Sequence, residues 1–419
     1  MFGRRSTTEA LVVGAGPVGL FAALQLARQG VEVEIIDSQW RTAARSYALA
    51  LHPQTLQLFD DLALTEPLLE HGRKVESVGF YDRKGREAAV DLRHLSDAYR
   101  YALVLPQSQL EAKLEEQLEA AGVKVKWNHR LAGLELNGGF VEATIQRLGK
   151  DSTGYSVSST EWVVEKTLTT EANFVFGADG CNSAVRRLAG ISFEDLGNSQ
   201  QFAVFECGTD RDAGSEVRVV LEEQETSVYW PLSGDRFRWS FGLSGVDTPD
   251  ERVKHRLAVQ IGEQTLPYLS PENLTELLAE RAPWFEAPVG EIFWSVGVQF
   301  DQRLATEFGC GRVSLLGDAA HMAGPVGVQS MNVGFAEAME LASLVTALIK
   351  RDAPKDSIDS YDRERASGWR RLLGLDSSPV ADESASDWIR HRADRIPACI
   401  PASGEMLGQA LEGLGLKLG

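Results

Sequence analysis

The chain has 419 residues, of which 43% are hydrophobic, and a formal net charge of −18 at pH 7. A chain of this length and composition can bury a sizeable core, either in two domains or in one domain with large insertions. The acidic excess argues against a nucleic-acid partner, because binding to a phosphate backbone depends on clustered Lys and Arg.

The first informative stretch, residues 9–20, predicts a strand, a tight turn and a helix. Its glycines have the Gly-x-Gly-x-x-Gly spacing of a dinucleotide-binding turn: Gly14, Gly16 and Gly19. The helix start would offer backbone N–H groups to a pyrophosphate. A second apolar run ends at Asp37, which is placed to accept hydrogen bonds from a ribose and argues against a 2′-phosphate. The alternative is a glycine-rich turn that binds no ligand.

The connection over residues 38–55 is long, and long ordered loops beside a cofactor site are often functional. Arg41 and Arg45 could reach the pyrophosphate or could be solvated surface residues. His52 opens the next predicted helix, and we expect it to be structural rather than catalytic. After short strands within residues 75–104, Gln107 begins an amphipathic helix, where it could contact a cofactor or cap the helix.

A strand is predicted over residues 123–127, followed by antiparallel strands as far as about residue 162. A further strand then ends in Gly-Ala-Asp179-Gly, and a helix begins near Ser183. Asp179 could accept from a ribose hydroxyl or cap that helix. Arg186, in the same helix, could bind phosphate or a nicotinamide donor, or could lie at a solvated helix end.

Residues 191–298 alternate apolar and polar side chains, with a helix predicted over 251–280. The segment is rich in Trp and Phe and includes the pair Tyr229 and Trp230. A sheet of this kind could form one wall of an apolar substrate site, and its aromatic residues could equally be the core of the sheet.

The third informative stretch begins where a predicted buried strand ends at Asp318. A loop rich in Gly and Pro follows, and then a long helix from about Asn332 to residue 349. The helix start favours negative charge beneath a loop that can lie flat against a planar ring. Asp318 could bind a sugar or ribityl hydroxyl. His321 could act as an acid or base, but a hydrogen-bonded structural histidine is more common beside a buried loop.

The last part of the chain, residues 351–419, predicts a polar helix around Tyr361 and then a weaker tail with Pro397 and Pro401. The apolar run 331–349 is interrupted by two glutamates, so we expect no membrane span. Residues 1–5 lack the apolar core of a signal peptide, and the four cysteines form no Cys-x-x-Cys pair. These features predict a cytoplasmic protein with free thiols and no zinc site.

In this order, Gly-x-Gly-x-x-Gly, Gly-Ala-Asp-Gly and Gly-Asp make the chain resemble the single-component (class A) FAD-dependent aromatic monooxygenases of the para-hydroxybenzoate hydroxylase type, over about residues 9–366. The resemblance implies that the ADP half of FAD is held by Gly14, Gly16, Gly19 and Asp37. It implies that Gln107 and Asp179 help to place FAD, and that Asp318 binds its ribityl–pyrophosphate region. The isoalloxazine ring would be lined by Pro325, Gly327, Met331 and Asn332.

The sequence departs from the family pattern at two places. The family loop Gly-Gly-Gln-Gly-Met-Asn is Gly327-Val328-Gln-Ser330-Met-Asn here, so two glycines are replaced by residues with side chains. An arginine that usually meets FAD is replaced by Tyr47, and Arg45 could take its place.

The resemblance implies an α/β fold in which a Rossmann-like FAD-binding domain with a mostly parallel sheet is interleaved with an antiparallel-sheet substrate domain. The FAD-binding domain would comprise residues 1–74, 103–189 and 299–352. The substrate domain would comprise residues 75–102 and 190–298, and C-terminal helices and a tail would occupy 353–419.

The activity that the resemblance implies is an NAD(P)H-dependent FAD monooxygenase. Such an enzyme inserts one oxygen atom from O₂ into an aromatic or electron-rich small molecule through a flavin hydroperoxide. FAD would be the cofactor, NAD(P)H a transient co-substrate, and the enzyme a monomer or homodimer without a membrane partner. The catalytic candidates are Pro325, Tyr229 and His321. The alternatives are a flavin-binding redox sensor or partner-binding module without turnover, and a flavin-dependent reductase or halogenase.

Overall fold

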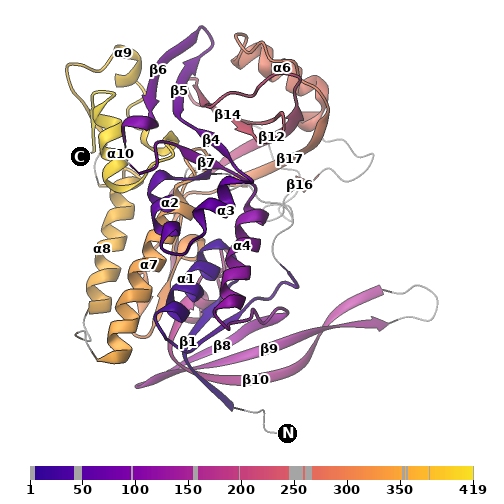
Figure 1. The fold of residues 1–419 in the computed structure, drawn as a ribbon, viewed down its shortest axis with the longest axis vertical. Coiled ribbons are helices and arrows are strands. Elements are labelled where there is room, and N and C mark those ends of the chain that lie inside the picture. Colours follow the sequence, from indigo (N-terminus) through magenta and orange to yellow (C-terminus); the bar gives the residue numbers. More distant parts are fainter. Residues whose placement is uncertain are drawn as a thin grey trace.

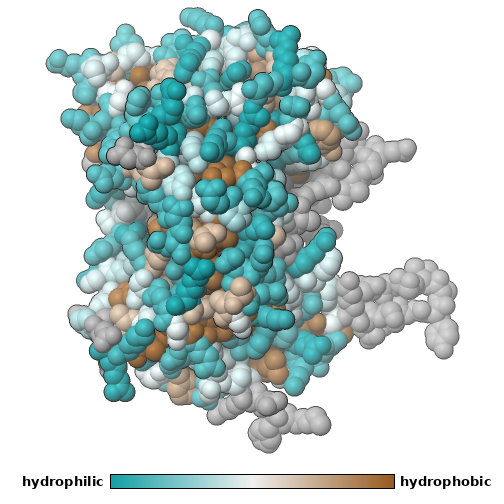
Figure 2. All heavy atoms as spheres, viewed as in Figure 1, coloured by the Kyte–Doolittle hydropathy of each residue, from teal (hydrophilic) through white to brown (hydrophobic). Residues whose placement is uncertain are grey.

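The computed structural model describes residues 5–41, 50–95, 98–153, 159–197, 199–244, 258–259, 267–351, 354, 357–376 and 378–418. Within these residues the chain forms two large sheets and two main groups of helices (Figure 1). Figure 2 shows a largely hydrophilic face with scattered hydrophobic patches, as expected where most large apolar side chains are buried.

The first large sheet has seven strands and carries the N-terminal glycine turn. Its main path is β19 (Gly309–Cys310), β20 (Val313–Leu315), β10 (Ser159–Gly177), β1 (Arg5–Val13) and β2 (Val33–Ile36). β1 pairs in parallel with β10 and β2, and β20 pairs in parallel with β10. The long antiparallel ribbon of β8 (His129–Asn137), β9 (Phe140–Thr153) and β10 extends away from the body of the molecule (Figure 1). The carboxyl ends of the four parallel strands therefore meet at one edge, where open α/β sheets bind ligands.

Helices cover the first sheet. They are α1 (Pro17–Arg28), α2 (Pro53–Asp60), α3 (Thr65–Leu69), α4 (Gln107–Ala120), α5 (Ala184–Leu188), α7 (Gln329–Lys350) and α8 (Ser357–Leu372). Residues Gly19 to Leu26 of α1 are all buried and are apolar except for Gln25, as expected of a helix between two layers. α7 is long and apolar enough to cross a membrane, but half of its apolar window is buried in this core, where Phe335 packs against Phe21 and Phe59.

Two small sheets connect the large ones. One consists of β3 (Ala50–Leu51), β7 (Ala102–Val104) and β4 (Arg73–Val75), and the other of β11 (Phe193–Asp195), β18 (Arg303–Ala305) and β21 (His321–Met322). The short 3₁₀ helices η1 (Leu92–His94) and η3 (Gly317–Ala319) lie beside them in the sequence.

The second large sheet has eight strands. Their order is β16 (Ala258–Val259), β17 (Ile292–Phe300), β12 (Gln200–Gly208), β15 (Arg236–Leu243), β14 (Thr226–Leu232), β13 (Glu216–Leu221), β5 (Ser77–Asp82) and β6 (Gly85–Asp91). One face packs the rings of Phe205, Tyr229 and Trp239 with residues of η2 (Pro267–Leu269) and α6 (Pro271–Arg281). The opposite face packs Val204 and Trp230 with the C-terminal segment. Both faces of this sheet are therefore covered.

The C-terminal segment, which we define as residues 378–418, is folded over the second sheet. It contains β22 (Val380–Ala381), α9 (Asp387–Arg390), η4 (Pro397–Cys399), α10 (Gly404–Glu412) and β23 (Leu416–Lys417). Its apolar side chains join the same core cluster as Val204 and Trp230, among them Ile389, Ile396, Ile400, Leu407 and Leu411. The sequence predicted C-terminal helices and a weaker tail, and the structure shows that the tail itself contains the helices α9 and α10.

Three other local predictions need correction. Residues 123–127 form no strand and contribute one bridge, between Ile36 and Lys126. In the region where a helix was predicted over 251–280, the described residues form the short strand β16, η2 and a helix only from Pro271. The long helix predicted from about Asn332 begins three residues earlier, at Gln329.

Candidate functional site

The glycine turn after β1 lies directly against the Asp179 turn after β10. Gly14 adopts a φ of 107°, and a Cβ there would collide with the carbonyl of Ala178. The backbone N–H of Gly14 donates to Ile36 (2.8 Å), and that of Ala178 donates to Val13 (2.8 Å). Two motifs about 165 residues apart in the sequence are thus in van der Waals contact, because β1 and β10 are neighbouring parallel strands.

The other two glycines of the turn have different surroundings. A Cβ on Gly19 would collide with the carbonyl oxygen of Gly14, so this glycine permits the helix to pack on the turn. A Cβ on Gly16 would meet no described atom within 4 Å, so there is open space in front of the N-terminus of α1. Among the described residues no side chain caps this helix, which leaves its first N–H groups directed at that space.

The carboxylate of Asp37 closes the glycine turn from the side. Its Oδ2 accepts from the backbone N–H of Ala15 (2.7 Å), and its Oδ1 accepts from that of Gln39 (2.7 Å). The residue is only half-buried, so its remaining lone pairs can also accept from a ribose hydroxyl at the end of β2.

In this structure Asp179 is a helix cap. Its Oδ2 accepts from Ala184 (2.6 Å) and Val185 (3.1 Å), and its Oδ1 accepts from the hydroxyl of Ser183. Burial raises the pKa of this carboxyl, and these hydrogen bonds oppose the rise. Asp179 therefore fixes the turn that contacts Gly14.

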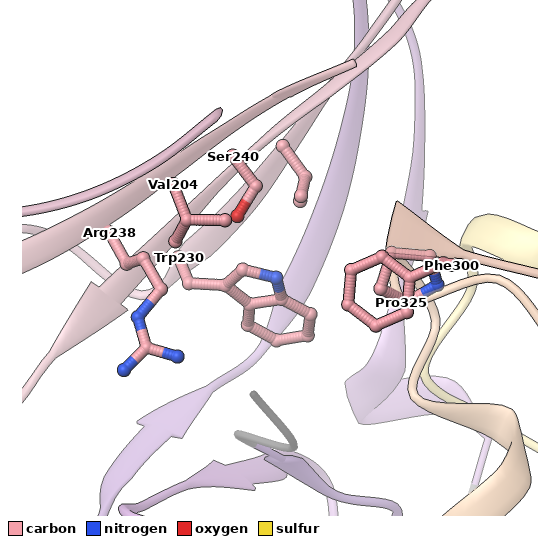
Figure 3. A pocket seen from close by; sticks show the side chains of 7 residues that line it. Val204, Trp230, Arg238, Ser240, Phe300 and Pro325 are labelled. Carbon is pink, nitrogen blue, oxygen red and sulfur yellow. The ribbon is translucent and has the colours of Figure 1, made fainter. Parts of the chain in front are cut away.

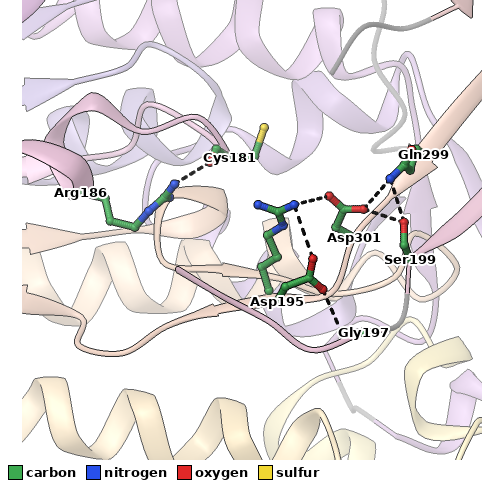
Figure 4. A network of polar contacts seen from close by, with 8 residues as sticks. Cys181, Arg186, Asp195, Gly197, Ser199, Gln299 and Asp301 are labelled. Carbon is green, nitrogen blue, oxygen red and sulfur yellow. Dashed lines mark hydrogen bonds and ion pairs between the residues drawn. The ribbon is translucent and has the colours of Figure 1, made fainter. Parts of the chain in front are cut away.

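Arg186 is buried and connects the second motif to the third. Its guanidinium donates to the carbonyls of Cys181 (2.8 Å; Figure 4) and Ala319 (2.8 Å), and it lies over the ring of Phe193. This arginine positions the Asp318 turn and is not available at a solvated helix end.

Figure 4 also shows Asp301 accepting from Ser199 and Gln299, and Arg303 pairs with the same carboxylate (2.9 Å).

The Asp318 turn lies against the start of α1. Gly317 has a φ of 56°, and a Cβ there would lie 3.3 Å from Val18 in α1. Gly334 of α7 approaches the same valine so closely that a Cβ would lie 2.9 Å from it. The Asp318 side chain is exposed to solvent. The protein atoms around its carboxyl nevertheless displace part of the surrounding water, and this desolvation raises the pKa of Asp318.

The loop before α7 is held from three sides. Val328 occupies the left-handed region (φ 53°), which is unusual for a β-branched residue, at the N-cap of α7. The hydroxyl of Ser330 accepts from the N–H of Ala323 (2.9 Å). The N–H of Gly327 donates to Ala398 of the C-terminal segment (2.9 Å). Ser330, one of the two departures from the family loop, thus supplies a hydrogen bond that a glycine could not make.

Asn332 and His52 hold the same loop from within. Asn332 donates to the carbonyls of Ala50 (2.9 Å) and Val328 (2.8 Å), and its oxygen accepts from the N–H of His52 (2.8 Å) and from Thr55. The Nε2 of His52 lies 2.8 Å from the carbonyl oxygen of Gly327. Both side chains are buried, so their role is to position the loop. Met331 is partly buried between the two largest core clusters.

These residues fit an extended dinucleotide cofactor. One edge of the first sheet carries the features that such a cofactor needs. They are the starts of α1 and α7, which no described side chain caps, the open space at Gly16 and the accessible Asp318. Gln107 lies at the start of α4 and donates to Glu111 (2.7 Å). Arg45 and Tyr47 lie outside the described residues.

A cavity lies between the loop before α7 and the second sheet (Figure 3). It is lined by Val204, Val228, Trp230, Arg238, Ser240, Phe300 and Pro325. Figure 3 shows the indole of Trp230 between the guanidinium of Arg238 on one side and Phe300 with Pro325 on the other. Of the predicted site residues, Pro325 lines this cavity. The cavity therefore lies between the loop before α7 and the second sheet.

Comparison with known proteins decides the family. Residues 7–374 match the model of the family described as FAD binding domain. The chain belongs to this FAD-binding family. The match covers most of the chain and confirms the resemblance inferred from the three motifs, the α/β fold and the prediction of FAD as cofactor.

Individual relatives are monooxygenases by name. The chain is 28% identical over 379 residues to 6-methylpretetramide 4-monooxygenase of Streptomyces rimosus, covering 89% of this chain and 62% of the relative. It is 30% identical over 366 residues to an aromatic compound monooxygenase of Bacillus subtilis, covering 87% of this chain and 66% of the relative. The chain thus spans somewhat less than two thirds of the length of these relatives.

A solved structure shares the whole fold. p-Nitrophenol 4-monooxygenase from Pseudomonas putida superposes with a TM-score of 0.71 at 21% identity, over 97% of this chain and 92% of that chain. The C-terminal segment is therefore largely included in the shared fold.

Two of the catalytic candidates lie away from the cavity of this FAD-binding fold. Tyr229 points to the opposite face of the second sheet, where its hydroxyl donates to Ala213 (2.9 Å) and burial raises its pKa to about 12. His321 is fully buried, with Nε2 2.7 Å from Glu337 and its ring stacked 3.7 Å from that of Trp369. Both side chains are therefore held by contacts within the protein and lie away from this cavity, and a catalytic role for them stays a prediction.

Sequence reasoning missed the cavity residues Arg238 and Ser240. A signal was present, because Arg236, Arg238 and Ser240 alternate with Phe237, Trp239 and Phe241 on one strand. Alternation predicts that the polar set shares a face, but only the structure shows that this face is covered and lines a cavity.

Proposed function

We propose that this protein is an FAD-dependent monooxygenase that uses NAD(P)H and O₂ to insert one oxygen atom into an aromatic or electron-rich small molecule. The observation that supports this proposal most directly is the position of the cavity. It lies between Pro325, in the loop that begins α7, and the face of the second sheet that carries Val204 and Trp230. The name of the Bacillus subtilis relative, an aromatic compound monooxygenase, favours an aromatic substrate.

In this proposal, the part of the chain around the seven-stranded sheet holds FAD and the eight-stranded sheet holds the substrate. The glycine turn and Asp37 would bind the ADP half, and the Asp318 turn would bind the ribityl–pyrophosphate region. Gly327, Met331 and the backbone at the start of α7 would contact the ring. Bound FAD would supply the chemistry by which electrons from NAD(P)H activate O₂.

The residues of this chain would orient the reactants and exclude water. The apolar side chains of Val204, Val228, Trp230 and Phe300 provide a cavity wall that keeps water from the reacting atoms. α7 is 22 residues long, and no side chain among the described residues caps its N-terminus. The free N–H groups at this end would stabilise negative charge on the flavin ring. α7 packs in the core of the protein. The cytoplasmic location stays a prediction from the sequence.

The test begins with purified protein reconstituted with FAD. The expected results are a bound yellow chromophore, NAD(P)H consumption that an aromatic compound accelerates, and a product heavier by one oxygen atom. Product masses are needed because uncoupled oxidation to peroxide also consumes NAD(P)H. Tight flavin binding with no oxygenated product from a broad aromatic panel would favour a redox sensor and contradict the proposal.

A further inference from the structure

The ribbon of β8, β9 and β10 extends away from the body of the molecule and exposes three consecutive apolar side chains (Figure 1). They are Trp162, Val163 and Val164 on β10, with exposed fractions of 48%, 37% and 46%. Single exposed apolar residues are common on folded proteins, but a run of three on one strand is unusual unless it has a function. The run does not line the cavity, so the proposed function does not explain it.

The same residues lie on an open edge of the first sheet. On one side of β10, Val163 pairs with Gly149 of β9 and Val164 pairs with Leu148. On the other side the first described partner of β10 is β1, whose pairing begins at Thr169. Within the described residues, no strand therefore pairs with this edge of β10 before Thr169. Such an edge presents backbone N–H and C=O groups that can pair with a strand of another chain.

The charge next to the apolar run does little to protect this edge. Charged side chains on an edge strand normally discourage pairing with other chains. The first charged residue after the run is Glu165, and its carboxylate turns back across the ribbon to lie 3.3 Å from Nε of Arg147 on β9. It covers Gly149, where a Cβ would collide with it. The carboxylate is therefore used within the ribbon.

The charge balance of the ribbon favours a second copy of the same chain as the partner. The chain has a net charge of −18, so most surfaces of two copies repel each other. Residues 147–166, in contrast, contain three basic and three acidic residues and carry no net charge. Because the ribbon extends away from the body, two ribbons can meet while the acidic bodies stay apart (Figure 1). A strand edge is also complementary to its own copy when the two strands run antiparallel about a twofold axis.

We propose that the edge of β10 around Val163 is a dimerisation surface, which pairs in antiparallel fashion with the same edge of a second copy. The two apolar runs would then lie side by side in one continuous sheet and cover part of each other. The contact is small compared with the standard interface of about 1,600 Å², so the dimer should dissociate on dilution. Dimerisation through this edge does not depend on the proposed function.

Sedimentation equilibrium of the FAD-loaded chain over a range of concentrations measures the association. The expected result is an equilibrium between monomer and dimer, because twofold pairing uses the β10 edge of both copies and leaves none for a third. In Val163→Lys and Val164→Lys the dissociation constant should rise at least tenfold, because pairing would bring the new charges together and partly bury them.

Leu136→Lys is the matched control for these variants. Leu136 is as exposed as Val164, at 46%, but it pairs with Val141 at the opposite end of β9. The substitution should leave the dissociation constant of the dimer unchanged. Melting temperatures close to that of the unmodified chain show that each variant is folded.

Cross-linking locates the contact without weakening it. Val163→Cys places a thiol next to the proposed twofold axis, where a short bismaleimide should join two copies through residue 163. Leu136→Cys should give no such link. Because Cys181 and Cys310 are also exposed, the masses of the linked peptides must identify the joined residues.

A monomer at every concentration overturns the inference. A dimer that keeps its dissociation constant in Val163→Lys and gives no link through residue 163 overturns it as well, because such a dimer uses another surface. A dimer that Val163→Lys weakens and Leu136→Lys does not, with a link between the two copies of residue 163, supports the proposed surface even if the chain oxygenates no substrate.

Discussion

Protonation of the His52 imidazole should weaken its contact with Gly327 and so destabilise the loop before α7. The carbonyl oxygen of Gly327 can only accept, so the neutral ring carries its proton on Nε2. Burial lowers the pKa of His52 to about 4. In the unfolded chain the same group takes up a proton near pH 6.5. The stabilisation is therefore complete above pH 6.5 and is lost as the pH falls towards 4.

We predict that the free energy of unfolding falls by about 2 kcal/mol between pH 6.5 and pH 5 through His52 alone. In His52→Gln the amide can still donate to Gly327 but does not titrate, so this part of the pH dependence should disappear. Urea denaturation at both pH values measures the difference. Equal pH dependence in the variant and the unmodified chain would contradict the account.

The contribution of Asp362, in α8, to the free energy of unfolding should depend on pH in the opposite direction to that of His52. Its carboxyl packs against Gly309, where a Cβ would lie 2.6 Å from Oδ2, and Oδ1 has no partner within the described part of the chain. Burial, with the charges of Asp359 and Glu307, raises the pKa of Asp362 to about 7. The unfolded chain releases this proton near pH 4, so stability is lost as the pH rises from about 4 to 7.

We expect Asp362→Asn to remove this loss. The side chain is partly exposed, so solvent reduces the effect, and a gain of about 1–2 kcal/mol at pH 8 is a reasonable magnitude. At pH 4 the carboxyl is protonated in the folded state, and the variant should gain little. Melting temperatures at the two pH values test this, and a stabilisation that is the same at both would show that charge is not its cause.

At the scale of single elements, the first turn of α1 separates ligand binding from packing. Gly16 faces open space, whereas Gly19 touches the backbone of Gly14. Gly16→Ala should therefore leave the melting temperature of the FAD-free protein nearly unchanged and weaken FAD binding at least tenfold, because its methyl group would enter the space in front of the helix start.

Gly19→Ala is the matched comparison within the same helix. Alanine gains about 1 kcal/mol of helix propensity, but its methyl group would collide with a backbone carbonyl, and such overpacking costs about 1–3 kcal/mol or more. The FAD-free Gly19→Ala protein should therefore melt at a lower temperature. FAD titration by fluorescence and thermal melting distinguish the two variants, and identical behaviour would contradict the assignment of Gly16 to the ligand side.

The elements that the sequence predicted well are those specified by local chemistry. The glycine turn, the start of α1 at Pro17 and the start of α5 after Ser183 each depend on a few adjacent residues. The failures depend on distant partners. Residues 123–127 have an alternating pattern, but β2 is only four residues long, and beside it they make a single bridge at Lys126. The lack of a longer strand partner could not be predicted from their own sequence.

The site divides in the same way. The three turns that we propose to bind FAD stand out in the sequence because glycine and aspartate at fixed spacing have few other uses. The positions of Tyr229 and His321 away from the cavity could not be predicted, because the strand face of one and the buried partner of the other are set by the tertiary fold. Arg238 was missed because an arginine on a strand normally faces solvent, and only the C-terminal segment and the loop before α7 make this face an interior.

At the scale of the whole molecule, the C-terminal segment connects the loop before α7 to the second sheet. Gln329 in the first turn of α7 donates to the carbonyls of Ile400 (2.7 Å) and Ala402 (2.9 Å). From the same segment, Arg395 donates to the carbonyls of Glu222 and Glu225 and to the hydroxyl of Thr226, next to β14. The cavity lies between these two anchored parts, so the segment sets the distance between the loop before α7 and the cavity face of the second sheet.

We predict that Gln329→Leu uncouples the loop without unfolding either sheet. The substitution replaces the amide with an apolar side chain of similar size and leaves two buried carbonyls without their donor, at a cost of about 1–3 kcal/mol for each unsatisfied group. Amide hydrogen exchange should accelerate at Gly327, whose N–H donates to Ala398, and in residues 397–403, while amides of β12 keep their protection. Arg392→Met is the control, because Arg392 bonds to Leu221 from the same segment without contacting the loop. It should leave exchange at Gly327 unchanged. Equal acceleration at Gly327 and in β12 of the Gln329→Leu protein would mean that the loop opens only by global unfolding, and that the segment is part of one cooperative unit with both sheets.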